Sequence, residues 1–335
     1  MNIEDLMVNE PMVITITHRG YIKRVPTSSY SKQHRGGKGK IAITVYEDDF
    51  IEQFFTSNTL DTLILITDLG RLYKLKVYKI PEVSRIAKGK AVVNLINLQE
   101  NEQIVMILPT QNFDDDKDLA FFTKNGIVKK TNLNEYANNR ANGVKAINLD
   151  ENDFVVDVKI LNTNSKSIFL ITKKGQSIRF KIEDVRTIGR VGRGVKGIKF
   201  KINGDYVCGV EIIEDEEKEL LIISEKGLGK RTISNEYRKQ NRAGTGVIAM
   251  KLTQKTGDIV GVILVSKEED LMCLTKTGKM IRVDMSGIRK TGRNASGVKV
   301  ISIEKNDMVV DISKCPKELE EDENLNFENR DNNLF

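Results

Sequence analysis

The arrangement of apolar and polar residues along the chain predicts β-strands. In the segment from Leu170 to Glu183, two apolar residues, a threonine and two lysines lead into Gly175. Beyond this glycine, Ile178, Phe180 and Ile182 alternate with charged residues. A period of two indicates a strand with one buried and one wet face, and glycine readily adopts the positive φ of a tight turn. The segment therefore predicts a β-hairpin.

This hairpin pattern recurs six times. The turn glycines are Gly20, Gly70, Gly126, Gly175, Gly227 and Gly278, at spacings of 50, 56, 49, 52 and 51 residues. A second glycine follows each of them by 17 or 19 residues, at Gly39, Gly89, Gly143, Gly194, Gly246 and Gly297. An acid and an apolar run come next, at Asp49, Glu102, Asp153, Asp205, Asp258 and Asp307. Each repeat thus holds a hairpin, a glycine-containing loop, a further strand, an acidic turn and another strand.

Four strands in about 50 residues are typical of one propeller blade. None of the repeats carries a convincing helical stripe of ten or more residues. We therefore predict an all-β fold, a six-bladed propeller-like ring of four-stranded antiparallel blades. We expect it to form a single domain over residues 11–314, with a leader or linker at 1–10 and a disordered acidic tail at 315–335.

The charge of the chain is unevenly distributed. The 335 residues include 53 basic and 47 acidic side chains, a net charge of +6. The segment from Lys317 to Phe335 contains seven acids and two bases, so the remainder carries 51 bases and 40 acids, or +11. A basic body with an acidic tail favours a polyanionic partner. We expect the tail either to keep the chain soluble or to imitate DNA by folding back on the basic surface.

The remaining composition argues against several classes of protein. The three cysteines, Cys208, Cys273 and Cys315, lie far apart and give neither a disulfide framework nor a zinc ligand set. With two histidines and no carboxylate pair, nucleophile–base set or nucleotide loop, we expect no metal, no cofactor and no catalysis by this chain alone. The longest apolar run has five residues and the N-terminus carries no secretory signal, so we expect a cytoplasmic chain without membrane contact.

Basic residues recur at fixed places in the repeats. The position four residues after the hairpin glycine holds Arg24, Lys74, Lys130, Arg179, Arg231 and Arg282, and the position before it adds Lys23, Lys129 and Lys230. The period of two predicts that the first of these sets faces outward. The loops before the second glycine add Arg85, Arg140, Arg190, Arg242 and Arg293. Arginine beside glycine suits phosphate, because the backbone can approach closely and guanidinium binds phosphate through two hydrogen bonds.

We interpret these positions as a rim that contacts DNA phosphates. The alternatives are that an outward strand face is simply polar and that the loops need glycine only for their turns. Aromatic residues are few and do not interleave regularly with the bases, which favours duplex DNA over stacked single strands.

One loop concentrates the same features: Gln33-His34-Arg35-Gly36-Gly37-Lys38-Gly39-Lys40. It has no P-loop spacing. The run from Gln33 to Gly39 resembles the gyrase A box, Q-[RK]-R-G-G-[RK]-G, the hallmark of the C-terminal domain of the DNA gyrase A subunit, with His34 where the box has Arg or Lys. The segment from Thr15 to Arg24 is similar to the opening of that domain, and the resemblance covers essentially all six repeats.

The resemblance implies a β-pinwheel, a six-bladed relative of the propeller. It implies that duplex DNA wraps around the basic rim with positive handedness and without sequence specificity, so that strand passage by the ATP-dependent topoisomerase introduces negative supercoils. The box residues would carry this role. The implied partners are the rest of the gyrase A subunit, which holds the cleaving tyrosine, and through it the gyrase B subunit. We expect the isolated domain to be a monomer and to associate with the nucleoid.

Three alternatives remain open. A regulatory propeller of the chromatin-exchange-factor type would not explain the box or the recurring bases. A topoisomerase IV C-terminal domain is closer, but that relative usually has fewer or degenerate blades and lacks an intact box. Because Met1 directly precedes the domain, we expect either an excised fragment or a separately made architectural DNA-binding protein.

Overall fold

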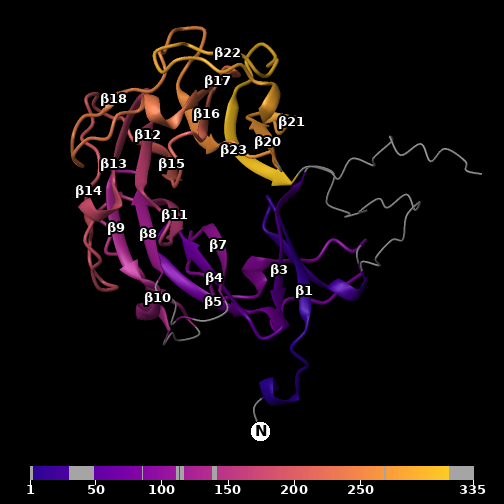
Figure 1. Ribbon diagram of the computed structural model, residues 1–335. Coiled ribbons are helices and arrows are strands. Elements are labelled where there is room, and N and C mark those ends of the chain that lie inside the picture. Colours follow the sequence, from indigo (N-terminus) through magenta and orange to yellow (C-terminus); the bar gives the residue numbers. More distant parts are fainter. Residues whose placement is uncertain are drawn as a thin grey trace, which may run out of the picture.

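A computed structural model describes residues 3–29, 49–84, 86–110, 113, 117–137, 142–267 and 269–316. These residues form six antiparallel sheets that follow one another around a ring (Figure 1). The prediction of a six-bladed all-β propeller is confirmed. None of the helices in the described segments is long and apolar enough to cross a membrane.

Each blade has a central hairpin. Its first strands are β1 (Pro11–Thr17), β4 (Thr62–Thr67), β8 (Asp118–Thr123), β12 (Ser167–Thr172), β16 (Glu219–Ser224) and β20 (Glu269–Thr275). Its second strands are β2 (Tyr21–Pro26), β5 (Arg71–Lys76), β9 (Ile127–Asn132), β13 (Gln176–Lys181), β17 (Leu228–Ile233) and β21 (Met280–Val283).

An inner strand flanks each hairpin, and among the described residues an outer strand flanks the hairpins of blades 1 to 5. The inner ones are β3 (Ile51–Asn58), β7 (Ile104–Thr110), β11 (Val155–Leu161), β15 (Val207–Ile213), β19 (Ile259–Leu264) and β23 (Val309–Pro316). The outer ones have two residues each: β6 (Lys90–Ala91), β10 (Val144–Lys145), β14 (Val195–Lys196), β18 (Val247–Ile248) and β22 (Val298–Lys299). The short helices are η1 (Ile3–Leu6), η2 (Thr27–Ser29), η3 (Val77–Lys79), η4 (Val92–Asn94), η5 (Leu133–Tyr136), η6 (Ile182–Asp184), η7 (Ser234–Glu236) and η8 (Met285–Gly287).

The recurring hairpin residues form one hydrogen-bonded turn. In blade 4, Gly175 has φ +83° and its N–H donates to the Thr172 carbonyl at 3.0 Å. The Thr172 hydroxyl accepts from the Gln176 N–H at 3.1 Å, and the Asp205 carboxylate accepts from the Lys174 N–H at 3.0 Å. The recurring threonine and acid therefore satisfy backbone donors of the turn and tie it to the start of the inner strand.

The outer strand of each complete sheet comes from the next repeat. The strand β14 pairs with β9 of the preceding blade, with Val195 opposite Val128, and the sheet order is β11-β8-β9-β14. The expectation that one repeat supplies all four strands of its own blade is therefore wrong. Each of repeats 2 to 6 gives three strands to its own blade and one strand to the blade before it. The sixth sheet has three strands among the described residues.

In repeats 2 to 6, the second glycine marks the point where the chain crosses to the preceding blade. Gly246 has φ +70°, and a Cβ atom there would lie 2.0 Å from the carbonyl oxygen of Ser177 in β13. A Cβ on Gly297 would lie 2.6 Å from the Gly229 carbonyl oxygen in β17. Only a residue without a side chain fits this crossing, so these loops need glycine for packing.

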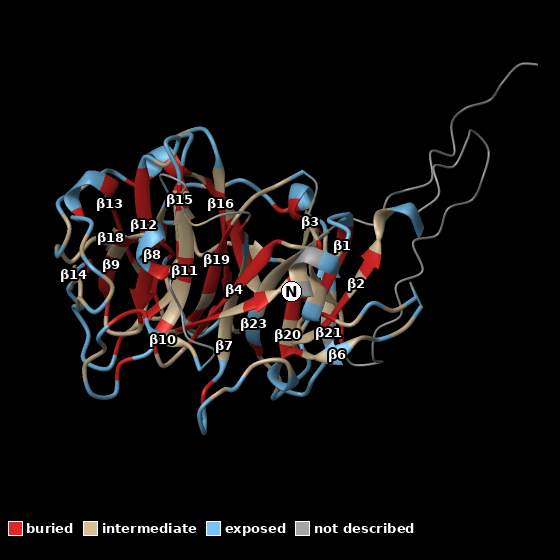
Figure 2. Cartoon of the chain, turned by 90° about the horizontal axis from the view of Figure 1, so that it is seen from below, coloured by how far each residue is buried: buried red, intermediate tan, exposed pale blue. Residues whose placement is uncertain are grey.

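The core lies between neighbouring sheets. One cluster joins Phe122 and Val128 of blade 3 to Leu170 and Phe180 of blade 4. Figure 2 shows the buried residues along the middle strands and the exposed ones in the connecting turns. Each blade thus buries its apolar faces against the blades beside it, as expected for a ring of stacked sheets.

The first and sixth blades meet at a cluster of titratable groups. The strand β23 lies against β3, and His18 Nε2 is 3.5 Å from Asp311 Oδ2 while His18 Nδ1 is 3.6 Å from Glu52 Oε1. The imidazole stacks on Phe50 with ring centroids 4.8 Å apart. The nearby carboxylate of Glu52, with the charges of Asp311 and Asp49, raises the pKa of His18 against the opposing effect of burial.

Replacing Gly246 with alanine tests the close crossing. We expect Gly246→Ala to lower the free energy of unfolding by about 2–4 kcal/mol, because a β-carbon meets the Ser177 carbonyl at a positive φ. Chemical denaturation measures this change. The control is Gly189→Ala, which should change little, because this loop glycine has no positive φ and a Cβ added to it would meet no atom within 4 Å. Equal effects of the two substitutions would contradict the packing role.

The contact between the first and sixth blades predicts a pH dependence. Because the folded-state pKa of His18 is raised, its stabilisation is complete below the unfolded pKa and is lost as the pH rises through the folded value. The stability difference between the unmodified chain and His18→Asn should therefore shrink from about pH 5 to about pH 8, as measured by denaturation. Lys276→Asn, at the matching turn position of blade 6, should show no such change.

Candidate nucleic-acid interface

The loop that ends in the second glycine runs along the outer edge of the preceding blade. In repeat 4, Thr187 forms a bridge with Lys130 of β9, and the Ile188 N–H donates to the Lys130 carbonyl at 2.9 Å. The chain then continues through Gly194 into the outer strand β14. The same bridge joins Lys239 to Arg179 and Lys290 to Arg231. These loops and outer strands together form the outer rim of the ring.

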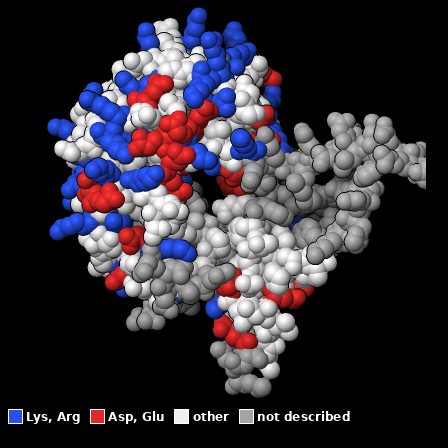
Figure 3. All heavy atoms as spheres, in the orientation of Figure 1, with Lys and Arg blue, Asp and Glu red and all other residues white. Residues whose placement is uncertain are grey.

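The outer rim carries exposed cations that the sequence pattern did not single out. Three lysines of the outer strands stand two residues after a second glycine, and three arginines follow the short helices of blades 4 to 6; all six are exposed: Lys145, Lys196, Lys299, Arg186, Arg238 and Arg289. Figure 3 shows Lys and Arg side chains along the left and upper outline, where Figure 1 places β14, β18 and β22. Their fixed distance from a glycine was the signal available in the sequence.

The arginines of the glycine loops also lie on the outer rim. Arg242 donates from Nε to the Asp184 carbonyl at 2.9 Å and from Nη1 to the Lys196 carbonyl at 3.2 Å. Arg293 donates from Nη1 to the Ile248 carbonyl at 2.6 Å. Each of these side chains therefore contacts the preceding outer strand, with guanidinium donors to spare for a ligand. Arg190 makes no side-chain ion pair within the described residues.

Of the six cations four residues after the hairpin glycine, which were predicted to face outward, only Arg282 of blade 6 is exposed; four are half-buried and one is buried. Arg179 is 2% exposed; its Nε donates to Ser167 Oγ at 2.9 Å and its Nη1 to the Ser234 carbonyl at 3.1 Å. Arg24 and Arg231 donate in the same way to the Ile80 and Ile288 carbonyls, at 2.8 and 2.6 Å. All three thus clamp one blade to the next. The physical reason is that the loop of the next repeat covers the outer edge of the second strand.

The other members of this set are also engaged within the protein. Lys130 pairs with Asp118 at 3.8 Å and Arg282 with Asp270 at 2.8 Å. Lys74 donates to the Ala137 carbonyl and lies 3.9 Å from the centroid of the Phe113 ring, and burial lowers its pKa to about 8. The recurrence of a base at this position therefore reflects contacts between and within blades.

The lysines one residue earlier are buried. Lys23, Lys129 and Lys230 are 2%, 0% and 0% exposed, and their Nζ atoms donate to backbone carbonyls. The prediction that they contact DNA is wrong, because no surface is left for a ligand to reach. The box Gln33–Lys40 and the loop residues Arg85 and Arg140 lie outside the described residues.

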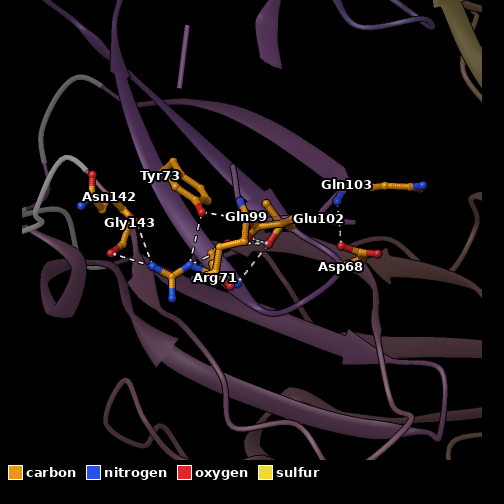
Figure 4. Close-up of polar contacts among 9 residues, drawn as sticks. Asp68, Arg71, Tyr73, Gln99, Glu102, Gln103, Asn142 and Gly143 are labelled. Atoms are coloured by element: carbon orange, nitrogen blue, oxygen red, sulfur yellow. Dashed lines mark hydrogen bonds and ion pairs between the residues drawn. The ribbon is translucent and has the colours of Figure 1, made fainter. Parts of the chain in front are cut away.

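The recurring acids accept hydrogen bonds from the turns. In blade 2, Glu102 accepts from the Thr67 hydroxyl and the Tyr73 hydroxyl, each at 2.6 Å, and from the Gln99 N–H at 2.7 Å (Figure 4). Arg71 donates to the Tyr73 oxygen at 3.2 Å and reaches the Gly143 carbonyl of the next repeat. No group of three or more His, Cys, Asp or Glu side chains within the described part of the chain is placed to hold a metal ion.

Known structures place this arrangement among the C-terminal domains of type IIA topoisomerases. The C-terminal domain of a DNA topoisomerase IV superposes with a TM-score of 0.81 at 27% identity, over 92% of this chain and 94% of that one. A DNA gyrase A C-terminal domain superposes with a TM-score of 0.67 at 30% identity, over 91% of this chain and 99% of that one.

The sequence comparisons are more specific. The profile of the family described as DNA gyrase C-terminal domain, beta-propeller, matches residues 11–58, 61–111, 117–162, 166–214, 218–266 and 269–316. The DNA gyrase A subunit of Campylobacter jejuni is 56% identical over 98% of this chain and 42% of that protein, and its Helicobacter pylori counterpart is 55% identical over 97% and 39%. The chain therefore belongs to the DNA gyrase C-terminal domain family. It spans about two fifths of the length of these relatives.

The burial of Arg179 gives a test that separates a clamp from a DNA contact. We expect Arg179→Met to lower the free energy of unfolding by about 2–3 kcal/mol, because the Ser234 carbonyl and Ser167 lose a buried donor. Arg186→Met, which removes an exposed arginine, should change stability by less than about 0.5 kcal/mol. Chemical denaturation measures both. A weaker affinity for DNA with unchanged stability in Arg179→Met would return this residue to the DNA-contacting set.

Proposed function

We propose that this chain binds duplex DNA along the outer rim without sequence specificity and wraps it with positive handedness, in the service of negative supercoiling by DNA gyrase. The observation that carries the proposal is the recurrence of exposed cations at the same place in successive blades, on a surface that follows the circumference of the ring. Membership of the gyrase family supports it. The remainder of the gyrase A subunit, and through it the B subunit, are the proposed partners, and DNA cleavage belongs to that remainder.

The chemistry of the rim fits phosphates rather than base edges. Lysine and arginine on short strands and loops reach phosphate oxygens, which fix the path of DNA and carry no sequence information. Bending 20–30 base pairs by 40–90° costs on the order of 1–6 kcal/mol, and a fuller wrap costs more. Contacts repeated in each blade offset this cost step by step. We expect this domain to be non-catalytic by itself.

A topoisomerase IV C-terminal domain is the second candidate. It is favoured by one observation, the higher TM-score of 0.81 against 0.67 for the gyrase domain. The 55–56% identity to gyrase A subunits over nearly the whole chain supports the gyrase assignment. Sequence similarity is the more discriminating of the two, because both enzymes use the same fold.

Relaxation of circular DNA by a topoisomerase in the presence of this chain tests the wrap. Positive wrapping leaves the purified circles positively supercoiled, because the bound turns are protected while the free DNA relaxes. We propose that the box carries this effect, so Arg35→Ala combined with Lys38→Ala should retain a gel shift and lose the change in linking number. An unchanged linking number shift in the double variant would contradict the role of the box.

Salt dependence tests the outer-strand lysines. We expect Lys145→Ala, Lys196→Ala and Lys299→Ala together to reduce the slope of log affinity against log salt by about 2–3, since each phosphate contact contributes about 0.9. The matched control replaces Lys166, Lys218 and Lys267, exposed lysines in the loops before β12, β16 and β20. Its slope should change by less than half as much. Equal losses in both triple variants would mean that the rim has no special role.

A further inference from the structure

A buried lysine alternates with an uncharged residue around the ring. Three residues after the hairpin glycine, the odd-numbered blades carry lysine and the even-numbered blades do not; the residues in order are Lys23, Tyr73, Lys129, Ile178, Lys230 and Ile281. An isoleucine occupies this position in blades 4 and 6, so packing one blade on the next does not by itself require a cation there.

Each buried ammonium group contacts the rim loop of the next repeat. Lys129 Nζ donates to the Ala146 carbonyl at 2.5 Å and to the carbonyl of Arg190. Lys230 Nζ donates to the Gly292 carbonyl at 3.0 Å and to the carbonyl of Arg293. In both blades the lysine therefore holds the backbone of the arginine that lies on the outer rim.

The first blade follows the same plan. Lys23 Nζ donates to the Ala87 carbonyl at 2.6 Å, in the corresponding loop of the second repeat. The lysine thus reaches the rim loop in all three odd-numbered blades.

This arrangement is costly for an ammonium group. The pKa of Lys129 is lowered to about 7 and that of Lys230 to about 8, chiefly by burial and to a smaller extent by the charges of Arg190 and Arg293. The carboxylates of Glu135 and Glu236 act in the opposite direction. Burying a cation costs free energy, and isoleucine occupies the same position in blades 4 and 6. We therefore infer that the lysine makes a specific contact that isoleucine cannot make.

We propose that Lys129 and Lys230, with Lys23, are positioning residues that hold the rim loops in the geometry in which Arg190 and Arg293 contact DNA phosphate. The proposal rests on the proposed function. A loop fixed before binding loses less conformational entropy when DNA binds, so the hold raises affinity without any contact between the lysine and DNA. The Arg293 side chain also donates a hydrogen bond to the Ile248 carbonyl. For Arg190, the described hydrogen bond is the one that its backbone carbonyl accepts from Lys129.

A double-mutant cycle in the full chain tests this proposal. Affinity for a linear DNA duplex is measured for Lys129→Met, Arg190→Ala and the combination. We expect each single substitution to weaken binding about fivefold and the double variant to bind no more weakly than Arg190→Ala alone. If the double variant lost affinity by the product of the two single losses, the proposal would be overturned. Such a result would mean that Lys129 affects binding independently of Arg190, for example through its charge.

Hydrogen exchange supplies a readout that does not depend on DNA. Lys129→Met should speed exchange of the amides at 190–194 and leave those of β8 and β9 unchanged. The control is Ile178→Met, a volume-conserving change at the same position in blade 4, which should alter neither exchange nor affinity. Unchanged exchange at 190–194 in Lys129→Met would show that Lys129 does not stabilise this loop and would overturn the proposal.

The outcomes separate this inference from the proposed function. If the unmodified chain does not bind duplex DNA, the proposed function fails. The hydrogen-exchange result still shows whether Lys129 stabilises the loop at 190–194. If it binds DNA and Lys129→Met binds equally well, only the inference fails. Should Lys129→Met not fold, Lys230→Met with Arg293→Ala gives the same cycle in blade 5.

Discussion

The structure depends on the close backbone crossing at which each of repeats 2 to 6 passes from its own blade to the edge of the blade before it. Gly246 meets the Ser177 carbonyl there at a distance that excludes any side chain, and two residues later the chain has completed the preceding sheet. No complete sheet can form from one repeat alone. The blades are therefore linked by shared β-sheet hydrogen bonds as well as by apolar packing between their faces.

This exchange also sorts the basic residues into two groups. Where the loop of the next repeat covers the middle of the second hairpin strand, a cation is enclosed and finds partners inside the protein, as Arg179 does with Ser167 and Ser234. Cations on the covering strand and loop, such as Lys196 and Arg186, remain in water. The same backbone thus builds the joints between blades and presents a charged rim, and the buried lysines connect the two.

Much of the fold followed from the sequence because hairpins are local. The period of two beyond Gly175 and the regular glycine spacing predicted six antiparallel blades, and the structure confirms them. The assignment of the site was weaker. Arg190, Arg242 and Arg293 do lie in rim loops, whereas Lys129 and Arg179 were misplaced, because their exposure depends on a segment about 60 residues away in the sequence. The boundary at 314 also fell short, since β23 runs to Pro316.

The sequence by itself determined the number of repeats, the hairpins, the turn chemistry of the threonines and acids, and the family, since each of these depends on residues close together in the chain. Only the tertiary structure decided which repeat completes which sheet and which bases remain accessible. A repeat period reports that every unit makes the same contacts, but it is identical whether those contacts lie within a unit or between neighbours. The position of the glycine loop on the preceding blade therefore had to be seen in three dimensions.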